Sequence, residues 1–140
     1  MGLVLVSRNA HKVVITAPIA LDIRKHIDEI PNFPKEGILF RDISPLIRNP
    51  SIWAHTIREM GELCEETNPD LIVGIEARGF VVGASLATFL AKGFVPIRKA
   101  GKLPGDICHE NYELEYGHDR IEIQRNAFMH KPKVLIVDDL

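Results

Sequence analysis

The chain has 140 residues, enough for one domain with a hydrophobic core, and its 46% hydrophobic and 26% charged residues are ordinary for a soluble globular protein. A formal net charge of -2 at pH 7 excludes the broadly basic surface that nucleic-acid binding requires. Two cysteines exclude a disulfide framework, six histidines show no metal-ligand spacing, and no segment has the length of a transmembrane helix. We therefore expect a cytoplasmic protein without nucleic-acid or membrane partners.

The N-terminal part of the chain is harder to assign than the rest. Residues 1–20 contain two stretches of strand-like composition, but nothing in the sequence predicts their partners. Isoleucines at near-helical spacing predict a short helix over Leu21–Ile30, which Pro31 ends. A rigid turn over Pro31–Pro34 should follow, and Ile38–Ile43 is expected to form a short strand or an extended loop.

The central part of the chain alternates between helix and strand signals. Asn49-Pro50 offers a side-chain cap followed by a proline suited to a first helical turn, which predicts a helix to about Glu66. The apolar run Leu71–Ile75 predicts a buried strand. After a turn, a second helix is expected over Val81–Lys92, with Gly93 as its C-terminal stop.

Two further strands and a hairpin complete the pattern. Val95–Ile97 predicts a short strand that runs into the basic, glycine-containing loop Arg98–Gly105. Alternating apolar and polar residues on both sides of Gly117–Arg120 predict a β-hairpin, and Val134–Val137 predicts a last buried strand. The order of these elements predicts an α/β fold with a mostly parallel sheet flanked by helices and a β-hairpin.

A polar cluster follows each of the three apolar strands. The clusters are Glu76–Phe80, Arg98–Gly105 and Asp138-Asp139. The carboxyl ends of parallel strands meet at one edge of a sheet, so we expect the three clusters to converge there. Arg78 beside a helix N-terminus suits a phosphate, although a surface arginine at an ordinary turn is the alternative. The cations Arg98, Lys99 and Lys102 suit a polyanion such as pyrophosphate, although a solvated basic loop is equally consistent with the pattern.

Other polar residues leave similar pairs of interpretations. Asp138 and Asp139 could bind ribose hydroxyls or a Mg²⁺ ion held on phosphates, or could cap a following helix. Glu115 and Tyr116 near the hairpin tip could form a lid with Glu115 as a proton donor or acceptor, or could simply be exposed. Phe40-Arg41 could stack on and hydrogen-bond a flat heterocycle, or could be a core phenylalanine beside a surface arginine.

Five stretches in this order resemble the motifs of the adenine phosphoribosyltransferases, a type I phosphoribosyltransferase family. Phe33–Pro45 resembles the N-terminal signature, Glu76–Phe80 the Arg-Gly-Phe turn and Ile97–Gly105 the basic loop. Tyr112–Gly117 resembles the lid, and Val134–Leu140 resembles the opening of the phosphoribosyl pyrophosphate motif. The resemblance implies the type I phosphoribosyltransferase fold with a hairpin lid. It also implies transfer of 5-phosphoribose from phosphoribosyl pyrophosphate to adenine, giving AMP and pyrophosphate in purine salvage.

The resemblance assigns roles to matching positions. It implies that adenine contacts Leu39, Phe40 and Arg41, that pyrophosphate is held by Arg78, Arg98, Lys99 and Lys102, and that the ribose hydroxyls are held by Asp138 and Asp139. It implies Glu115 as the general acid or base and Tyr116 as the residue that closes the lid. It further implies Mg²⁺ bound through the substrate pyrophosphate, without a direct protein ligand, and a homodimer.

The resemblance covers residues 21–140, which we expect to be the phosphoribosyltransferase domain, whereas residues 1–20 form an atypical N-terminal segment. The family pattern continues after the two acids into a Thr-Gly-Gly-Thr type loop that cradles the 5′-phosphate. We therefore expect the chain to be C-terminally incomplete and to end within the phosphoribosyl pyrophosphate motif. Two alternative functions follow: a truncated, inactive product, or a non-catalytic regulator of the same fold that binds a purine or a phosphate.

Overall fold

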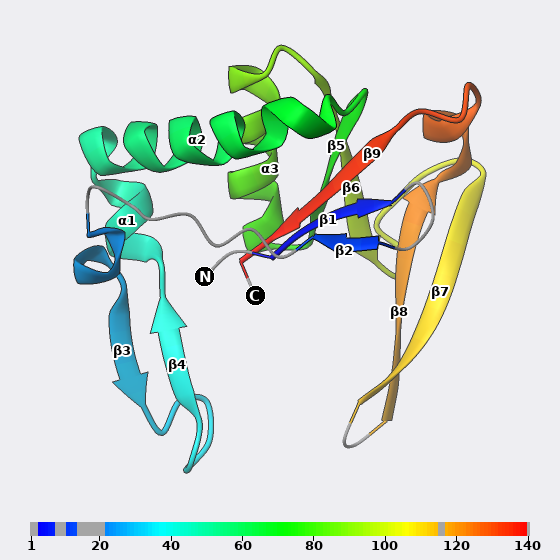
Figure 1. The fold of residues 1–140 in the computed structure, drawn as a ribbon. Coiled ribbons are helices and arrows are strands. Elements are labelled where there is room, and N and C mark those ends of the chain that lie inside the picture. Colours follow the sequence, from blue (N-terminus) through cyan, green and yellow to red (C-terminus); the bar gives the residue numbers. More distant parts are fainter. Residues whose placement is uncertain (1–2, 8–10, 14–21, 115–116, 140) are drawn as a thin grey trace.

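The computed structural model describes residues 3–7, 11–13, 22–114 and 117–139. Within these residues the main element is a seven-stranded sheet with the strand order β2-β1-β9-β5-β6-β8-β7 (Figure 1). Its strands are β1 (Leu3–Ser7), β2 (His11–Val13), β5 (Leu71–Ile75), β6 (Gly93–Lys99), β7 (Ile107–Leu114), β8 (Gly117–Gln124) and β9 (Val134–Asp138). A separate two-stranded sheet is formed by β3 (Asp28–Pro31) and β4 (Leu39–Asp42).

The centre of the main sheet is parallel. Strand β5 lies between β9 and β6, with Ile72 opposite Leu135 on one side and Phe94 on the other. Ile72 and Leu135 are fully buried, as a strand covered within an α/β fold requires. The strands farther out are antiparallel: β1 pairs with β9, and β8 pairs with β6. The expected fold class is confirmed, with parallel pairing at the centre and antiparallel pairing on both sides.

Two helices cover this parallel centre. They are α2 (Pro50–Cys64) and α3 (Arg78–Phe89), and a short helix α1 (Ser44–Arg48) precedes them. Their apolar sides form one core with the central strands, whose buried members are Cys64, Ile72, Val82, Leu86, Ala87, Leu135 and Val137. The predicted cap of α2 is confirmed, because the Asn49 side chain accepts hydrogen bonds from the backbone N–H groups of Ser51 and Ile52, both at 3.2 Å. Three 3₁₀ helices, η1 (Ile23–His26), η2 (Glu65–Thr67) and η3 (Arg125–Phe128), connect other described elements.

Helix α3 begins earlier than the sequence indicated. The expectation of a turn up to Phe80 and a helix over Val81–Lys92 is wrong at both ends, because α3 runs from Arg78 to Phe89. Arg78, Gly79 and Phe80, which the sequence placed in the turn, form the first turn of the helix. The predicted stop at Gly93 is also wrong: Ala91 adopts the left-handed conformation, with φ of 52°, and Gly93 already belongs to β6.

The two strands β3 and β4 form an arm that projects from the body of the molecule (Figure 1). We call Asp28–Asp42 the β3–β4 arm. The predicted helix over Leu21–Ile30 is wrong, since the described part forms only η1 before entering β3. A helix of that length is marginal on its own, and antiparallel pairing, with Ile30 opposite Phe40, satisfies the backbone instead. The extended reading of Ile38–Ile43 is confirmed by β4.

The predicted hairpin is formed by β7 and β8, which project from the other side of the view (Figure 1), but the expected turn over Gly117–Arg120 is wrong, because these residues open β8. Its strands are paired from Ile107 opposite Gln124 to Leu114 opposite Gly117. The proposed lid residues Glu115 and Tyr116 lie outside the described residues. The helices that the structure describes include none long and apolar enough to cross a membrane.

Candidate functional site

The N-terminus of α3 packs directly against the carboxyl ends of β5 and β9. Gly79 makes this approach possible, because a β-carbon there would lie 2.8 Å from the carbonyl oxygen of Val137 and 3.1 Å from Oδ1 of Asp138. Gly74 on β5 is equally restricted, since its β-carbon would collide with the backbone carbonyl of Gly79. Both glycines are therefore needed for close contact between strand and helix, and they place a carboxylate beside a helix start.

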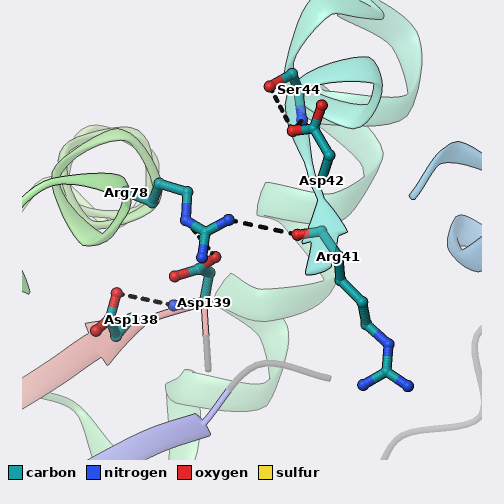
Figure 2. Close-up of polar contacts among 6 residues, drawn as sticks. All are labelled: Arg41, Asp42, Ser44, Arg78, Asp138 and Asp139. Carbon is teal, nitrogen blue, oxygen red and sulfur yellow. Dashed lines mark hydrogen bonds and ion pairs between the residues drawn. The ribbon is translucent and has the colours of Figure 1, made fainter. Parts of the chain in front are cut away.

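The two acids at the end of β9 have different surroundings (Figure 2). Oδ2 of Asp139 lies 2.8 Å from Nε of Arg78, and the Asp139 side chain is only 10% exposed. Asp138 instead accepts a hydrogen bond from the backbone N–H of Asp139 at 3.0 Å. Burial raises the pKa of Asp138 above its usual range, and the neighbouring Asp139 carboxylate acts in the same direction. The two acids therefore differ, with Asp139 paired to a cation and Asp138 desolvated.

Arg78 connects the two acids to the β3–β4 arm (Figure 2). Its Nη1 donates to the backbone carbonyl of Arg41 at 3.3 Å, and its guanidinium carbon lies 5.0 Å from the ring centroid of Phe40. The Arg41 side chain points away from Arg78, with its Nε 3.5 Å from Oε1 of Glu29. One guanidinium therefore spans from the end of the central sheet to the backbone and the aromatic ring of the arm.

The residues that the sequence assigned to a flat heterocycle lie on β4. Leu39 is 49% exposed, and Phe40 is half-buried against Phe33, with ring centroids 5.1 Å apart in an edge-to-face arrangement. Asp42 closes the strand by accepting hydrogen bonds from the hydroxyl and the backbone N–H of Ser44 at 2.6 and 2.9 Å. These bonds hold the pKa of Asp42 below its usual range. The arm thus presents an apolar face beside the Arg78 guanidinium.

The predicted basic loop Arg98–Gly105 begins later than expected, because β6 runs to Lys99, and it is anchored to the end of β5 by Glu76. Nη2 of Arg98 lies 3.1 Å from Oε1 of Glu76, and the backbone N–H of Lys99 donates to Oε2 at 2.8 Å. The Arg98 bond, followed by the Lys99 N–H bond, holds the pKa of Glu76 below its usual range, with a smaller contribution from the charge of Lys102. Glu76 was placed in a polar cluster from the sequence, but its role in anchoring this loop was not predicted.

A second carboxylate anchors the same loop from the hairpin. The backbone N–H of Gly101 donates to Oε2 of Glu122 on β8 at 2.9 Å, and the Glu122 side chain is 1% exposed. The other carboxylate oxygen, Oε1 of Glu122, lies 2.6 Å from Nη2 of Arg120. Sequence reasoning missed Glu122. No signal in the sequence indicates its burial, because alternation places Glu122 on the face opposite Ile121 and Ile123 and so predicts an exposed acid.

The structure brings the three predicted polar clusters together. Glu76 pairs with Arg98, and Arg78, two residues after Glu76, pairs with Asp139. The expected convergence at the carboxyl ends of the parallel strands is confirmed. Lys99 and Lys102 are exposed on this edge, where they face solvent. In the described residues, no group of three or more His, Cys, Asp or Glu side chains is arranged to hold a metal ion.

Comparison with known proteins gives consistent matches. No family model matches the chain. The chain is 59% identical over 120 residues to the adenine phosphoribosyltransferase of Prochlorococcus marinus (strain MIT 9303), which covers 86% of this chain and 70% of the relative. It also resembles a solved adenine phosphoribosyltransferase from Saccharomyces cerevisiae, complexed with an imino-altritol bisphosphate and adenine. That likeness has a TM-score of 0.73 and 47% identity, over 76% of this chain and 62% of that one.

A second solved adenine phosphoribosyltransferase, from Thermoanaerobacter pseudethanolicus, superimposes with a TM-score of 0.77 at 44% identity. The match covers 81% of this chain and 66% of that one. The chain therefore spans about two thirds of the length of the proteins that it matches, between 62% and 70%.

Proposed function

Because the chain belongs to the adenine phosphoribosyltransferase family, we propose that its function is the transfer of 5-phosphoribose from phosphoribosyl pyrophosphate to adenine, giving AMP and pyrophosphate in purine salvage. One observation carries this proposal: the cations at the end of β6 and the acids at the end of β9 flank one turn, Glu76–Arg78, at a single sheet edge. A ligand that carries both a pyrophosphate group and ribose hydroxyls has chemistry that suits these cations and acids.

The reaction breaks the bond between C1 of the ribose and a pyrophosphate oxygen, and the electron pair leaves with the pyrophosphate. A ring nitrogen of adenine forms the new bond to C1 and loses its proton. Positive charge builds on the sugar ring and negative charge on the leaving group. We propose that Arg98, Lys99 and Lys102 hold the leaving pyrophosphate, because fixed cations facing a developing anion lower the barrier by several kcal/mol.

The acids and the arm would hold the other two parts of the substrates. Asp138 and Asp139 are proposed to accept hydrogen bonds from the ribose hydroxyls. Leu39, Phe40 and Arg41 are proposed to contact adenine, which the exposed Leu39 and the Phe40 ring on the arm support. A planar base on an aromatic ring gains about 1–3 kcal/mol by stacking in nucleic-acid complexes.

Arg78 lies between these two regions. Its guanidinium contacts Asp139, the Arg41 carbonyl and the Phe40 ring at the same time. We propose that it also reaches the pyrophosphate, which would require it to exchange at least one of these contacts. The proposed site is therefore held in order by an internal ion pair before substrate arrives.

The lid is proposed on the resemblance alone. Glu115 is the proposed general acid or base, and Tyr116 is proposed to close over the substrates. Both follow β7, whose hairpin with β8 is the kind of projecting element that lids use. A lid that excludes water would favour attack by adenine over hydrolysis of the reactive sugar.

We propose Mg²⁺ as the cofactor, bound through the substrate pyrophosphate. The residues present fit this arrangement, because Mg²⁺ keeps several waters and binds through substrate phosphates with few protein ligands. The described residues accordingly offer two neighbouring acids at the site rather than a full cage. When bound, the ion would neutralise charge on the pyrophosphate.

The remaining proposals concern the whole protein. We propose a cytoplasmic homodimer in which residues 21–140 form the phosphoribosyltransferase domain and residues 1–20 an atypical N-terminal segment. A dimer is supported by large apolar side chains left exposed on α3, with Val81 at 40% and Phe89 at 48%. Neither residue belongs to the buried stripe of α3, so a second chain could cover them.

The test is formation of AMP from adenine, phosphoribosyl pyrophosphate and Mg²⁺. Two forms should be compared: the 140-residue chain and the same chain extended at its C-terminus with the corresponding segment of the Prochlorococcus relative. AMP formed by either form supports the transferase. If neither form makes AMP while the chain still binds pyrophosphate, the transferase proposal is wrong and a phosphate-binding regulator is favoured. Loss of turnover in the active form on changing Glu115→Gln, with substrate affinity retained, would support its proton-transfer role.

A further inference from the structure

Glu122 is a charged residue that the proposed reaction does not use, yet it is more deeply buried than any other charged side chain in the described part of the chain. It is 1% exposed, and the other buried polar residue there is the uncharged Thr56. A carboxylate out of water is costly unless it is paired and hydrogen-bonded. Its position on β8 therefore needs a compensating role.

The contacts of Glu122 show what that role is. Oε2 accepts the backbone N–H of Gly101 at 2.9 Å. Oε1 lies 2.6 Å from Nη2 of Arg120, but this contact lacks hydrogen-bond alignment, and no described residue donates a hydrogen bond to Oε1. The Arg120 side chain is 42% exposed, whereas Oε1 of Glu122 is buried. The well-aligned bond of the carboxylate is thus the one to the basic loop.

This bond completes a set of three that fixes the loop backbone. Three successive N–H groups all donate to fixed acceptors: Lys99 to Glu76 at 2.8 Å, Ala100 to the Arg120 carbonyl at 3.2 Å, and Gly101 to Glu122. Gly101 has φ of 75°, which turns the chain at the point where the Glu122 bond holds it. The loop is therefore anchored on β5 through Glu76 and on β8 through Glu122, with Lys99 and Lys102 left exposed.

We propose that Glu122 is a positioning residue for the pyrophosphate subsite, acting through the Gly101 N–H to hold the Lys99–Lys102 backbone in its anion-binding conformation. A loop ordered in advance does not have to be ordered by the ligand, so binding is stronger. The inference rests on the proposed function, because it takes this loop to be where pyrophosphate binds. It goes beyond that function by assigning a role to a residue that does not touch the substrate.

Two substitutions separate the reach of the side chain from its charge. Glu122→Gln keeps an acceptor at the distance of Gly101 but removes the charge, whereas Glu122→Asp keeps the charge and withdraws the acceptor by one methylene. Binding of Mg-pyrophosphate to each full chain is measured by calorimetry, with backbone hydrogen exchange of the loop as a second readout. Losing a hydrogen bond to a charged group changes an equilibrium constant by roughly tenfold or more. We therefore expect Glu122→Asp to bind Mg-pyrophosphate about tenfold more weakly and to show faster hydrogen exchange at the Gly101 N–H. The affinity of the Glu122→Gln variant for Mg-pyrophosphate should fall by about threefold at most, because its amide oxygen can still accept the Gly101 N–H.

The matched control is Ile57→Ala, a large-to-small change in the core of α2, where Ile57 is 6% exposed. It lowers stability without touching the loop, so pyrophosphate affinity should not change. If Glu122→Gln weakens binding more than Glu122→Asp, or if Ile57→Ala weakens it as much, the positioning role is wrong. Failure of the unmodified chain to bind pyrophosphate would instead refute the proposed anion site itself, and the two failures are thereby distinguished.

Discussion

Replacing Arg78 with methionine should lower the free energy of unfolding by about 3 kcal/mol near neutral pH, because the change leaves the Asp139 carboxylate buried without its cation. Methionine keeps an apolar stem of similar length, so packing along the side chain is largely retained. What is removed is the guanidinium, together with its contacts to Asp139, to the Arg41 carbonyl and to the Phe40 ring.

The magnitude follows from the exposure and the distances of these contacts. Asp139 is 10% exposed and 2.8 Å from Nε, whereas Arg78 is 35% exposed, which places the pair between a surface ion pair and a buried one. Breaking a fully buried pair costs about 3–5 kcal/mol and an exposed one about 0–1, so about 2 kcal/mol is appropriate here. The 3.3 Å bond to the Arg41 carbonyl and the 5.0 Å approach to the Phe40 ring each add about 0.5 kcal/mol.

The measurement is urea unfolding of a double-mutant cycle with Arg78→Met and Asp139→Asn. The asparagine change alone should cost less, about 1 kcal/mol, because the one-third exposed Arg78 can turn towards water while Asp139 cannot. Arg41→Met is the matched control in the same region: its ion pair with Glu29 is 68% and 59% exposed, so stability should change by less than about 0.5 kcal/mol. A coupling between Arg78 and Asp139 below about 0.5 kcal/mol would refute the reasoning.

Three further outcomes are expected. Glu76→Gln should reduce the loss of unfolding free energy at acid pH. The lowered pKa of Glu76 contributes stability that is present above its ordinary value of 4.5 and is lost as the pH falls through the lowered pKa. If the unfolding free energies of the Glu76→Gln variant and the unmodified chain fall equally steeply from pH 6 to pH 3, this prediction is contradicted. Burial raises the pKa of Cys64 to about 11, so a thiol reagent should modify Cys108 first in the native chain, and equal rates for the two would be inconsistent with a buried Cys64. Gly79→Ala should cost about 2 kcal/mol in urea unfolding, because its β-carbon would lie 2.8 Å from the Val137 carbonyl; an unchanged midpoint would show that the strand end shifts freely.

The parts of the fold that could be predicted are those in which a single local pattern decides the structure. The runs Leu71–Ile75 and Val134–Val137 are apolar on both faces, which leaves few alternatives to buried parallel strands. Strand direction then fixed where the polar residues after each strand would meet. The pairing of Glu76 with Arg98 and of Arg78 with Asp139 follows from that convergence, although the sequence did not say which acid would pair with which cation.

The parts that were mispredicted depend on contacts between distant segments. Leu21–Ile30 has helical spacing, but Ile30 pairs across the β3–β4 arm with Phe40, and this pairing outweighs a weak local preference. Glu122 looks like an exposed acid in an alternating strand until the Gly101 loop is seen to cover it. The burial of such a residue depends on a loop that lies 21 positions away in the sequence, which periodicity does not report.

The turn Glu76–Arg78 accounts for how this edge of the sheet is organised. It carries an acid and a base two positions apart, and each is paired with a partner of opposite charge from a different strand: Glu76 with Arg98 at the end of β6, and Arg78 with Asp139 after β9. An anion placed on this edge must therefore compete with carboxylates that already hold these two guanidinium groups. A ligand that draws Arg78 away from Asp139 would also disturb the bond from Arg78 to the Arg41 carbonyl, so anion binding at Arg78 and the position of the β3–β4 arm are expected to be coupled.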